Sequence, residues 1–152
     1  FVEPTIGAEL LRTEAVKEGL PMRKPNWSVA KSPITTQDTI EQFTKMENQG
    51  VKLTGGLDMG MAYATFEKSA ASAWAMVEFL GNDSWKAIKT MTLINAECLR
   101  IDNITGSISP NKSADFITFE KNPIDNIRNL TINPSDVILE GKLLKRNHRI
   151  LN

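Results

Sequence analysis

The segment that spans residues 50–60 constrains the fold of this chain more than any other part of the sequence. It runs from Gly50 through a short β-prone stretch, residues 51–54, into a glycine-rich turn that contains Asp58. The residues before Gly50 have the spacing of an amphipathic helix. Because helix, glycine, short strand and glycine-rich turn form half of a βαβ unit, the segment predicts an α/β fold.

Helical spacing recurs along the first two thirds of the chain. We predict helices over 8–18, from Thr35 or Thr36 to Gly50, over 65–80 and over 84–100, with glycines as stop signals and Asp83 as a cap. The expected apolar faces are Ile40, Phe43 and Met46 in the second helix, Ala70, Ala73, Trp74, Val77 and Leu80 in the third, and Trp85, Ile88, Thr92 and Leu99 in the fourth. Residues 21–33, rich in proline, predict a long surface loop.

After Arg100 the sequence changes to short β-prone runs between turn residues. We predict strands over 106–108, 115–119, 136–139 and 143–145, with a tight hairpin turn at 140–142. Residues 1–5 are also short and β-prone. The predicted order is therefore an α/β part followed by a small antiparallel β module.

Several of these segments resemble the amidohydrolase superfamily, in its imidazolonepropionase-like and prolidase-like branch. There the last barrel strand ends in glycine, any residue, aspartate, as Gly56-Leu57-Asp58 does, and the paired helices end in a threonine-asparagine-alanine pattern, here within residues 91–96. Residues 105–117 resemble the family's glycine-serine-isoleucine, proline-glycine-lysine, alanine-aspartate segment, and 122–127 and 136–142 continue it in register. The order and spacing of these motifs, over roughly residues 50–147, make coincidence unlikely.

The resemblance implies the carboxy-terminal portion of a TIM-type (β/α)8 barrel, with its last one or two strands and their helices, followed by a small β-sandwich. The expected boundaries are 1–104 for the partial barrel and 105–152 for the sandwich. The family usually has glycine where Asn111 stands. We expect positive φ there, which asparagine tolerates better than most residues.

The resemblance also implies a metal-dependent hydrolase that cleaves C–N bonds of amides, cyclic amides or peptide-like small molecules. Asp58 would ligate a divalent metal, zinc above all, or accept a proton from the metal-bound water. The local sequence alone also allows a simpler role, since aspartate among glycines is a common turn former. Whether the complete site holds one metal or two stays open.

The histidines that a complete metal site needs are missing. A catalytic zinc has about three protein ligands. The one histidine of this chain, His148, lies close to the end, and we expect it to be a solvated terminal residue. If residues 1–5 are the seventh strand, the chain contains two of eight barrel strands. The chain begins with Phe1 and not methionine, so we expect a missing amino-terminal part and an inactive polypeptide in isolation.

Other candidate residues are weaker. Asp115 is expected to anchor a turn by hydrogen bonds, and no spacing singles out Glu3 or Glu9. Basic and aromatic residues alternate in the predicted loop, at Arg23, Lys24, Trp27 and Lys31. With 18 basic and 18 acidic residues the net charge is zero, which argues against nucleic acid or an anionic membrane as a partner.

Two hypotheses about function remain at this point. One is a hydrolase piece whose active site is completed elsewhere, and the other is a non-catalytic module that self-associates. Two barrel strands alone leave unpaired edges, which pair readily with other chains, so we expect a homo-oligomer. No stretch of 18 apolar residues predicts a membrane span. A cytoplasmic location is favoured, since residues 1–5 lack the order of a signal peptide, and the compartment is left open because we expect the natural amino terminus to be missing.

Overall fold

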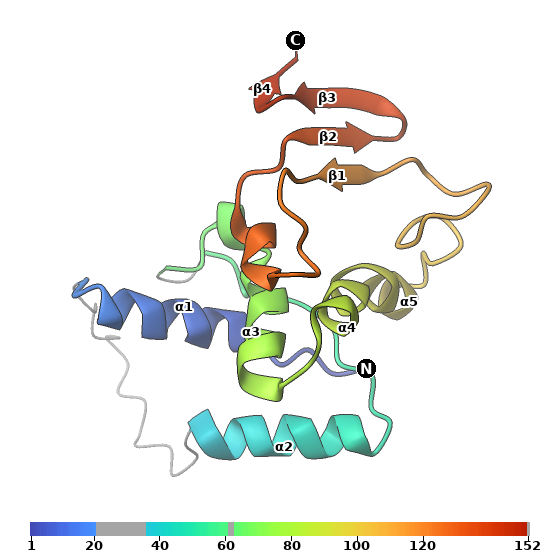
Figure 1. The fold of residues 1–152 in the computed structure, drawn as a ribbon. Helices are drawn as coiled ribbons and strands as arrows, with labels where there is room; N and C mark the ends of the chain where they lie inside the picture. The colour runs from blue at the N-terminus through green and yellow to red at the C-terminus, as the bar shows by residue number, and fades with distance from the viewer. Residues whose placement is uncertain (21–35, 61–62, 152) are drawn as a thin grey trace.

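The computed structural model describes residues 1–20, 36–60 and 63–151. Helices occupy most of the first two thirds of the chain, and a small sheet forms the last part (Figure 1). The predicted loop at 21–33, with its basic and aromatic residues, lies outside the described residues. No helix in the described part of the chain is both long and apolar enough to cross a membrane.

The four predicted helices are present, and two of them are irregular. Helices α1 (Ile6–Lys17) and α2 (Thr36–Asn48) are regular, whereas the third begins with a 3₁₀ turn, η1 (Phe66–Lys68), before α3 (Ala71–Leu80). The fourth consists of α4 (Ser84–Lys89), a π-helical segment, η2 (Thr90–Ile94), and α5 (Asn95–Leu99). Sequence spacing therefore located each helix and missed the two departures from α geometry.

Helix ends follow the predicted signals. The Asp83 carboxylate accepts a hydrogen bond from the backbone N–H of Lys86 at 2.7 Å, which is N-capping geometry. Gly19, Gly50 and Gly81 have φ angles of 71°, 85° and 65°. Since only glycine adopts such angles without a steric cost, these residues end the helices as predicted.

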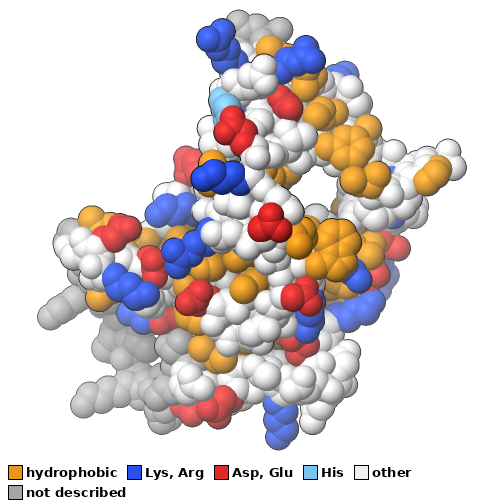
Figure 2. All heavy atoms as spheres, viewed as in Figure 1, with side chains coloured by type: hydrophobic (Ala, Val, Ile, Leu, Met, Phe, Trp, Pro, Cys, Tyr) orange, Lys and Arg blue, Asp and Glu red, His pale blue; other side chains and the backbone are white. Residues whose placement is uncertain are grey.

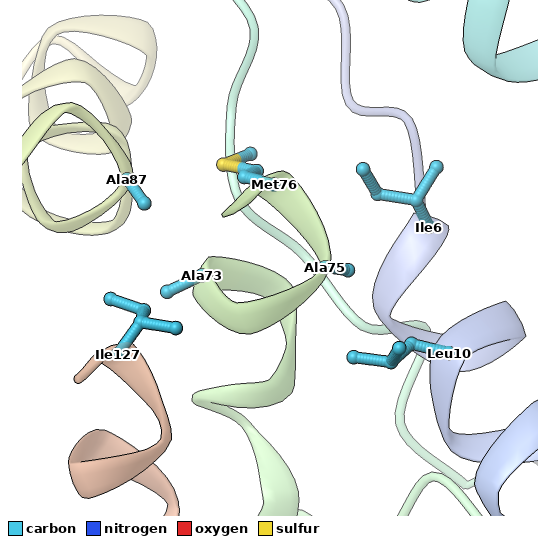
Figure 3. Packing of buried hydrophobic residues seen from close by; sticks show 7 residues of the cluster. All are labelled: Ile6, Leu10, Ala73, Ala75, Met76, Ala87 and Ile127. Atoms are coloured by element: carbon cyan, nitrogen blue, oxygen red, sulfur yellow. The ribbon is translucent and has the colours of Figure 1, made fainter. Parts of the chain in front are cut away.

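Helix α3 lies at the centre of the helical part, and its burial differs from the prediction. Figure 3 shows Ala75 directed towards Leu10 of α1, and Ala73 directed towards Ile127 and Ala87 of α4. Met76 is 1% exposed within the same cluster. The expected apolar face does pack against the core, with Ala73 buried and Trp74, Val77 and Leu80 partly buried, but α3 is contacted from both sides and also buries Ala75 and Met76.

The predicted apolar face of the fourth helix is wrong at its ends. Trp85 and Leu99 are 61% and 68% exposed, while the buried positions are Ala87, Thr90 and Ala96. A π-helical segment adds a residue to the turn and shifts the register of the helix. Residues before and after η2 that would share one face of a regular α-helix therefore point in different directions.

The two β-prone segments of the α/β part meet in one parallel bridge between Val2 and Leu53. The N–H of Val2 donates to the carbonyl of Lys52 at 3.0 Å, and the N–H of Thr54 donates to the carbonyl of Val2 at 2.9 Å. Residues 1–5 and 51–54 were predicted as strands, and the structure reduces them to this single bridge.

Four short antiparallel strands form one sheet in the order β1 (Phe116–Thr118), β2 (Asp136–Leu139), β3 (Lys142–Arg146) and β4 (Arg149–Ile150). The predicted hairpin turn is confirmed, with positive φ at Glu140 (50°) and Gly141 (77°). Sequence analysis missed β4. The sheet lies beside the helices, at the carboxy-terminal end of the fold (Figure 1).

Three further predictions for this module have clear outcomes. The strand expected over 106–108 is absent, because Gly106 has a φ of 87° and a Cβ there would lie 2.5 Å from the Cβ of Ala96. Asn111 has a φ of 67°, as expected for a position usually held by glycine. The described residues form one sheet, where the resemblance implied two packed sheets.

The sheet exposes apolar side chains of a kind that a second layer would cover. Ile117, Leu139 and Ile150 are 57%, 51% and 82% exposed, and Figure 2 shows hydrophobic side chains on the surface over the strands. Exposed apolar residues gathered on one element commonly mark a contact surface.

We expect Gly7→Ala to destabilise the protein although alanine favours a helix over glycine by about 1 kcal/mol. An added Cβ would lie 2.7 Å from Cδ1 of Leu57 and 2.9 Å from the backbone nitrogen of Ser72, which cannot rotate away. Overpacking of this kind typically costs about 1–3 kcal/mol. Urea denaturation followed by circular dichroism measures the change. The exposed control Lys17→Ala should stay within about 0.5 kcal/mol of the wild type.

Candidate functional site

Asp58 lies in the turn directly after the parallel bridge. Its neighbour Leu57 is 3% exposed and packs in a second apolar cluster with Leu11, Ala64 and Ala71. Asp58 itself is exposed and has a φ of 51°. Burial of Leu57 therefore anchors the turn to the core, while the side chain of Asp58 stays at the surface.

Asn95, the first residue of α5, holds the start of this turn. Its side-chain oxygen accepts a hydrogen bond from the Gly55 N–H at 2.8 Å, and its side-chain NH₂ donates to the Gly55 carbonyl at 2.8 Å. One carboxamide thus satisfies both backbone polar groups of a residue that follows the bridge. The turn is tied to α5 across 40 residues of sequence.

Gly56 is held next to Gly55 by two further contacts. The Ser72 hydroxyl, from the first turn of α3, donates to the Gly56 carbonyl. On the other side of the residue, a Cβ on Gly56 would lie 2.6 Å from Cδ of Glu3. A Cβ on Gly55 would collide with the sulfur of Met91. A Cβ on either glycine would therefore displace the flexible end of a neighbouring side chain.

Charged side chains near the turn form ion pairs or hydrogen bonds with residues other than Asp58. Lys52 forms an ion pair with Glu97 of α5, and the Glu3 carboxylate accepts a hydrogen bond from the Thr5 N–H at 2.7 Å. Glu9 instead bonds to Arg12 one turn along α1, and this hydrogen bond raises the pKa of Arg12. Among the described residues, none forms a recorded hydrogen bond with the Asp58 carboxylate.

A complete metal site is not formed by the described residues. They contain no group of three or more histidine, cysteine, aspartate or glutamate side chains placed to share an ion. Asp58 alone falls short of the approximately three protein ligands of a catalytic zinc. The residues present therefore do not fit a resident metal by themselves, and Asp58 can supply one carboxylate to a site.

Asp115 has the structural role predicted for it. Its carboxylate accepts hydrogen bonds from the Glu140 N–H (2.8 Å), the Ser113 hydroxyl (2.9 Å) and the Thr105 hydroxyl (3.0 Å). The Glu140 N–H above all, followed by the Ser113 hydroxyl, lowers the pKa of Asp115. Asp115 thus joins the 105–113 loop to the β2–β3 hairpin turn.

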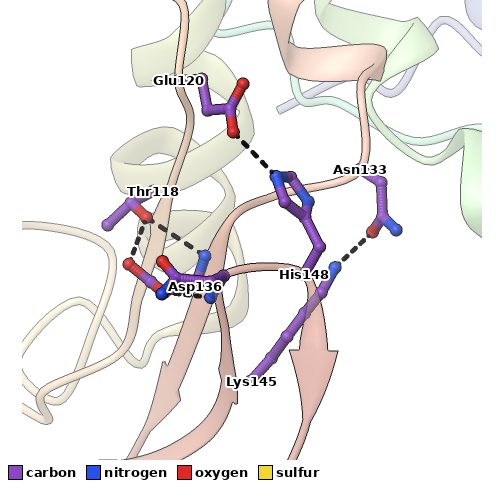
Figure 4. Close-up of polar contacts among 7 residues, drawn as sticks. Thr118, Glu120, Asn133, Asp136, Lys145 and His148 are labelled. Atoms are coloured by element: carbon purple, nitrogen blue, oxygen red, sulfur yellow. Dashed lines mark hydrogen bonds and ion pairs between the residues drawn. The ribbon is translucent and has the colours of Figure 1, made fainter.

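A second polar cluster lies on the sheet (Figure 4). Asp136 accepts hydrogen bonds from the Asn147 N–H (3.0 Å) and the Thr118 hydroxyl (3.0 Å), and these bonds, the first more than the second, lower the pKa of Asp136. His148, predicted to be a solvated terminal residue, is exposed, but it lies in the β3–β4 turn and contacts Glu120 at 3.1 Å. These groups pair with one another, and the cluster stabilises the sheet.

Sequence analysis assigned no role to the residues that hold the turn, although Asn95 stands in the threonine-asparagine-alanine pattern within residues 91–96. Ser72 lies in a helix predicted to bury other positions, and nothing in its local sequence distinguishes it. Asn95 carried a signal, because asparagine is a weak helix former and stands here inside a helical run. Its partner, however, lies far away in the sequence and emerges only in the folded chain.

Comparison with known proteins establishes the family. A model described as the amidohydrolase family matches residues 1–144, and the chain therefore belongs to the amidohydrolase family. Comparison with curated protein sequences gave no match. The solved structures that resemble the chain include prolidase-like amidohydrolases, whose carboxy-terminal part it matches.

Three of these structures are informative. A Xaa-Pro dipeptidase with methionine bound in its active site is 32% identical over 93% of this chain, with a TM-score of 0.72. A prolidase in complex with N-methylphosphonate-L-proline is 25% identical over 96%, with a TM-score of 0.69. Ochratoxinase from A. niger is 25% identical over 95%, with a TM-score of 0.71. The chain spans 34%, 35% and 31% of these proteins, about a third of their length.

We expect Asp115→Asn to lower the melting temperature at pH 7 and to flatten its dependence on acid pH. Because the folded-state pKa of Asp115 lies below the ordinary value of about 3.9, the ionised carboxylate stabilises the fold above that value. This stabilisation is lost as the pH falls through the lower, folded-state pKa.

Melting curves by circular dichroism between pH 7 and pH 2 test this expectation. The control is Asp125→Asn, at an exposed position with no recorded hydrogen bond of its carboxylate to a described residue. The control should follow the wild type. A variant Asp115→Asn with the wild-type pH dependence would contradict the anchoring role.

Proposed function

We propose that this chain is the carboxy-terminal part of a metal-dependent amidohydrolase, in which Asp58 supplies one active-site carboxylate. The observation that carries the proposal is the position of Asp58: exposed, in the turn that follows a strand-like segment whose Leu53 forms a parallel bridge with Val2. Barrel enzymes place their chemistry at the carboxy-terminal ends of parallel strands.

The contacts around the turn support a functional position over a simple turn. Asn95, Ser72 and the buried Leu57 fix the backbone on three consecutive residues, 55–57. A surface turn needs no such restraint, whereas a catalytic group must be held close to its productive geometry.

The bond that we propose for cleavage is the C–N bond of a peptide-like amide. A Xaa-Pro dipeptidase, a prolidase with a proline phosphonate and an ochratoxinase are similar to this chain, the first with 32% identity. The remaining metal ligands would come from the part of a barrel that the chain does not contain. Zinc is the proposed metal, with Asp58 either as a ligand or as the group that takes a proton from the attacking water.

The test is a fusion in which the full 152-residue chain replaces the corresponding carboxy-terminal third of the Xaa-Pro dipeptidase. We expect the chain alone to bind no stoichiometric zinc and to leave Xaa-Pro dipeptides intact. The fusion should hydrolyse them, and a chelator should abolish the activity. Asp58→Asn in the fusion should lower kcat by about 10²-fold or more, in the range of positioned acid–base groups.

The matched control is Asp102→Asn, which alters a carboxylate in the loop after α5 and should leave kcat unchanged. A folded, active fusion in which Asp58→Asn keeps full activity would refute the assigned role. Hydrolysis by the isolated chain that survives Asp58→Asn would refute it as well.

We propose as a second candidate a non-catalytic module that associates with itself, because one strand edge is open. Val2 uses the Lys52 carbonyl and the Thr54 N–H. In an extended chain the N–H and carbonyl of Leu53 then face the opposite edge, and no described residue forms a recorded backbone hydrogen bond with them. Open edges of this kind pair with other chains.

The second candidate predicts a dimer or larger species at micromolar concentration, measured by light scattering coupled to size exclusion. In the fusion, barrel strands would cover the edge at Leu53, so the association through this edge should disappear. A monomeric isolated chain at the same concentration would contradict the candidate.

A further inference from the structure

We propose that Asn95 is a positioning residue for Asp58. The proposal rests on the proposed function, since it assigns to a residue of α5 the placement of the carboxylate that the reaction uses. Asn95 contacts neither a substrate nor a metal in this proposal. It acts through the backbone of Gly55, three residues before Asp58.

The Asn95 carboxamide takes the place of a neighbouring strand. Its two hydrogen bonds to Gly55, each 2.8 Å long, use one N–H and one carbonyl, as a paired residue in a sheet does. In an extended chain, Gly55 directs these groups to the same edge as Leu53, opposite the edge bonded to Val2. A strand that paired with Leu53 would therefore have to end at Gly55, because Asn95 already occupies that position.

This ending determines where the chain leaves the sheet. From Gly55 onwards the backbone is no longer available for strand pairing and enters the turn that contains Asp58. The Ser72 hydroxyl fixes the next carbonyl, and Leu57 is buried one residue later. The side chain of Asp58 has no recorded hydrogen bond to the described residues, so its direction is set by this backbone.

Asn95 is itself held rigidly for this role. It is the residue at which the π-helical segment η2 passes into α5, and Met91, one turn earlier, lies against Gly55. Glu97, two residues later, forms an ion pair with Lys52 at the start of the strand-like segment. Three side chains of one helical stretch therefore contact residues 52–55 and join the helix to the turn.

If Asn95 positions Asp58, its substitution should change the rate of the reaction and not only the stability of the protein. A displacement of about 1 Å in a reacting group costs on the order of 100-fold in rate. In the active fusion we expect Asn95→Ala to lower kcat by about 10- to 100-fold and to leave KM within about twofold. Asn95→Asp keeps an acceptor for the Gly55 N–H and faces the Gly55 carbonyl with a second oxygen, so its loss of kcat should be intermediate.

Two controls separate position from stability. Thr92→Ala alters an exposed hydroxyl of the same helical stretch, which bonds to the Ile88 carbonyl, and should keep the wild-type kcat. Leu10→Ala removes a core side chain that is 2% exposed and belongs to a different apolar cluster from Leu57, so it should lower the melting temperature without lowering kcat. Equal losses of kcat in Leu10→Ala and Asn95→Ala would overturn the proposal.

A second measurement needs no activity. In the isolated chain, the amide proton of Gly55 is protected by Asn95 alone among the described residues. Asn95→Ala should speed its hydrogen exchange by at least about tenfold, while amides in α1 keep their rates and Thr92→Ala leaves Gly55 unchanged. Unaltered exchange at Gly55 would overturn the proposal.

The outcomes also separate this inference from the proposed function. If Asp58→Asn retains full activity in the fusion, the proposed function fails, and the positioning role fails with it. If Asp58→Asn is inactive while folded Asn95→Ala keeps the wild-type kcat, only the inference about Asn95 fails.

Discussion

The packing of α3 between its neighbours is the constraint on which the rest of the structure depends. Small side chains let α1 and α4 approach it from opposite sides: Ala73 and Ala75 are fully buried, and Gly7 of α1 lies against the backbone of Ser72. Interiors are close-packed, so even one added methyl group at such a contact forces neighbouring atoms to shift. The first turn of α3 also carries Ser72 and Ala71, which contact the turn at 56–57, so this end of α3 links the helical core to the candidate site.

The backbone of the turn places the Asp58 carboxylate at the surface, although no described residue forms a recorded hydrogen bond with it. Backbone hydrogen bonds from Asn95 and Ser72, together with the burial of Leu57, define the path of the chain, and Asp58 follows as the first exposed residue. This arrangement suits a group whose partners lie outside the chain. It agrees with the finding that the chain spans about a third of the length of the prolidase-like amidohydrolases that it resembles, one of which is 32% identical.

Local signals in the sequence predicted local structure well. Asp83 caps α4, Gly81 ends α3, and Asn111 adopts the positive φ expected of it, since each of these depends on neighbouring backbone only. The prediction for Asp115 was also correct: two of its partners, Ser113 and Thr105, are close in sequence, whereas the third, Glu140, lies 25 residues away. The second buried face of α3 was missed, because α3 is contacted from two sides, and the strand at 106–108 was wrong, because Gly106 is held in the left-handed region against Ala96.

The sequence by itself determined the family, the order of helices and strands, and Asp58 as the candidate carboxylate, because motifs, caps and turn residues are encoded in a few neighbouring positions. Only the tertiary structure decided how that carboxylate is held. Asn95 and Gly55 are 40 residues apart, and Ser72 and Gly56 are 16 residues apart. Hydrogen bonds over such separations depend on how α3 and α5 pack against the bridge at Leu53, which no local pattern specifies.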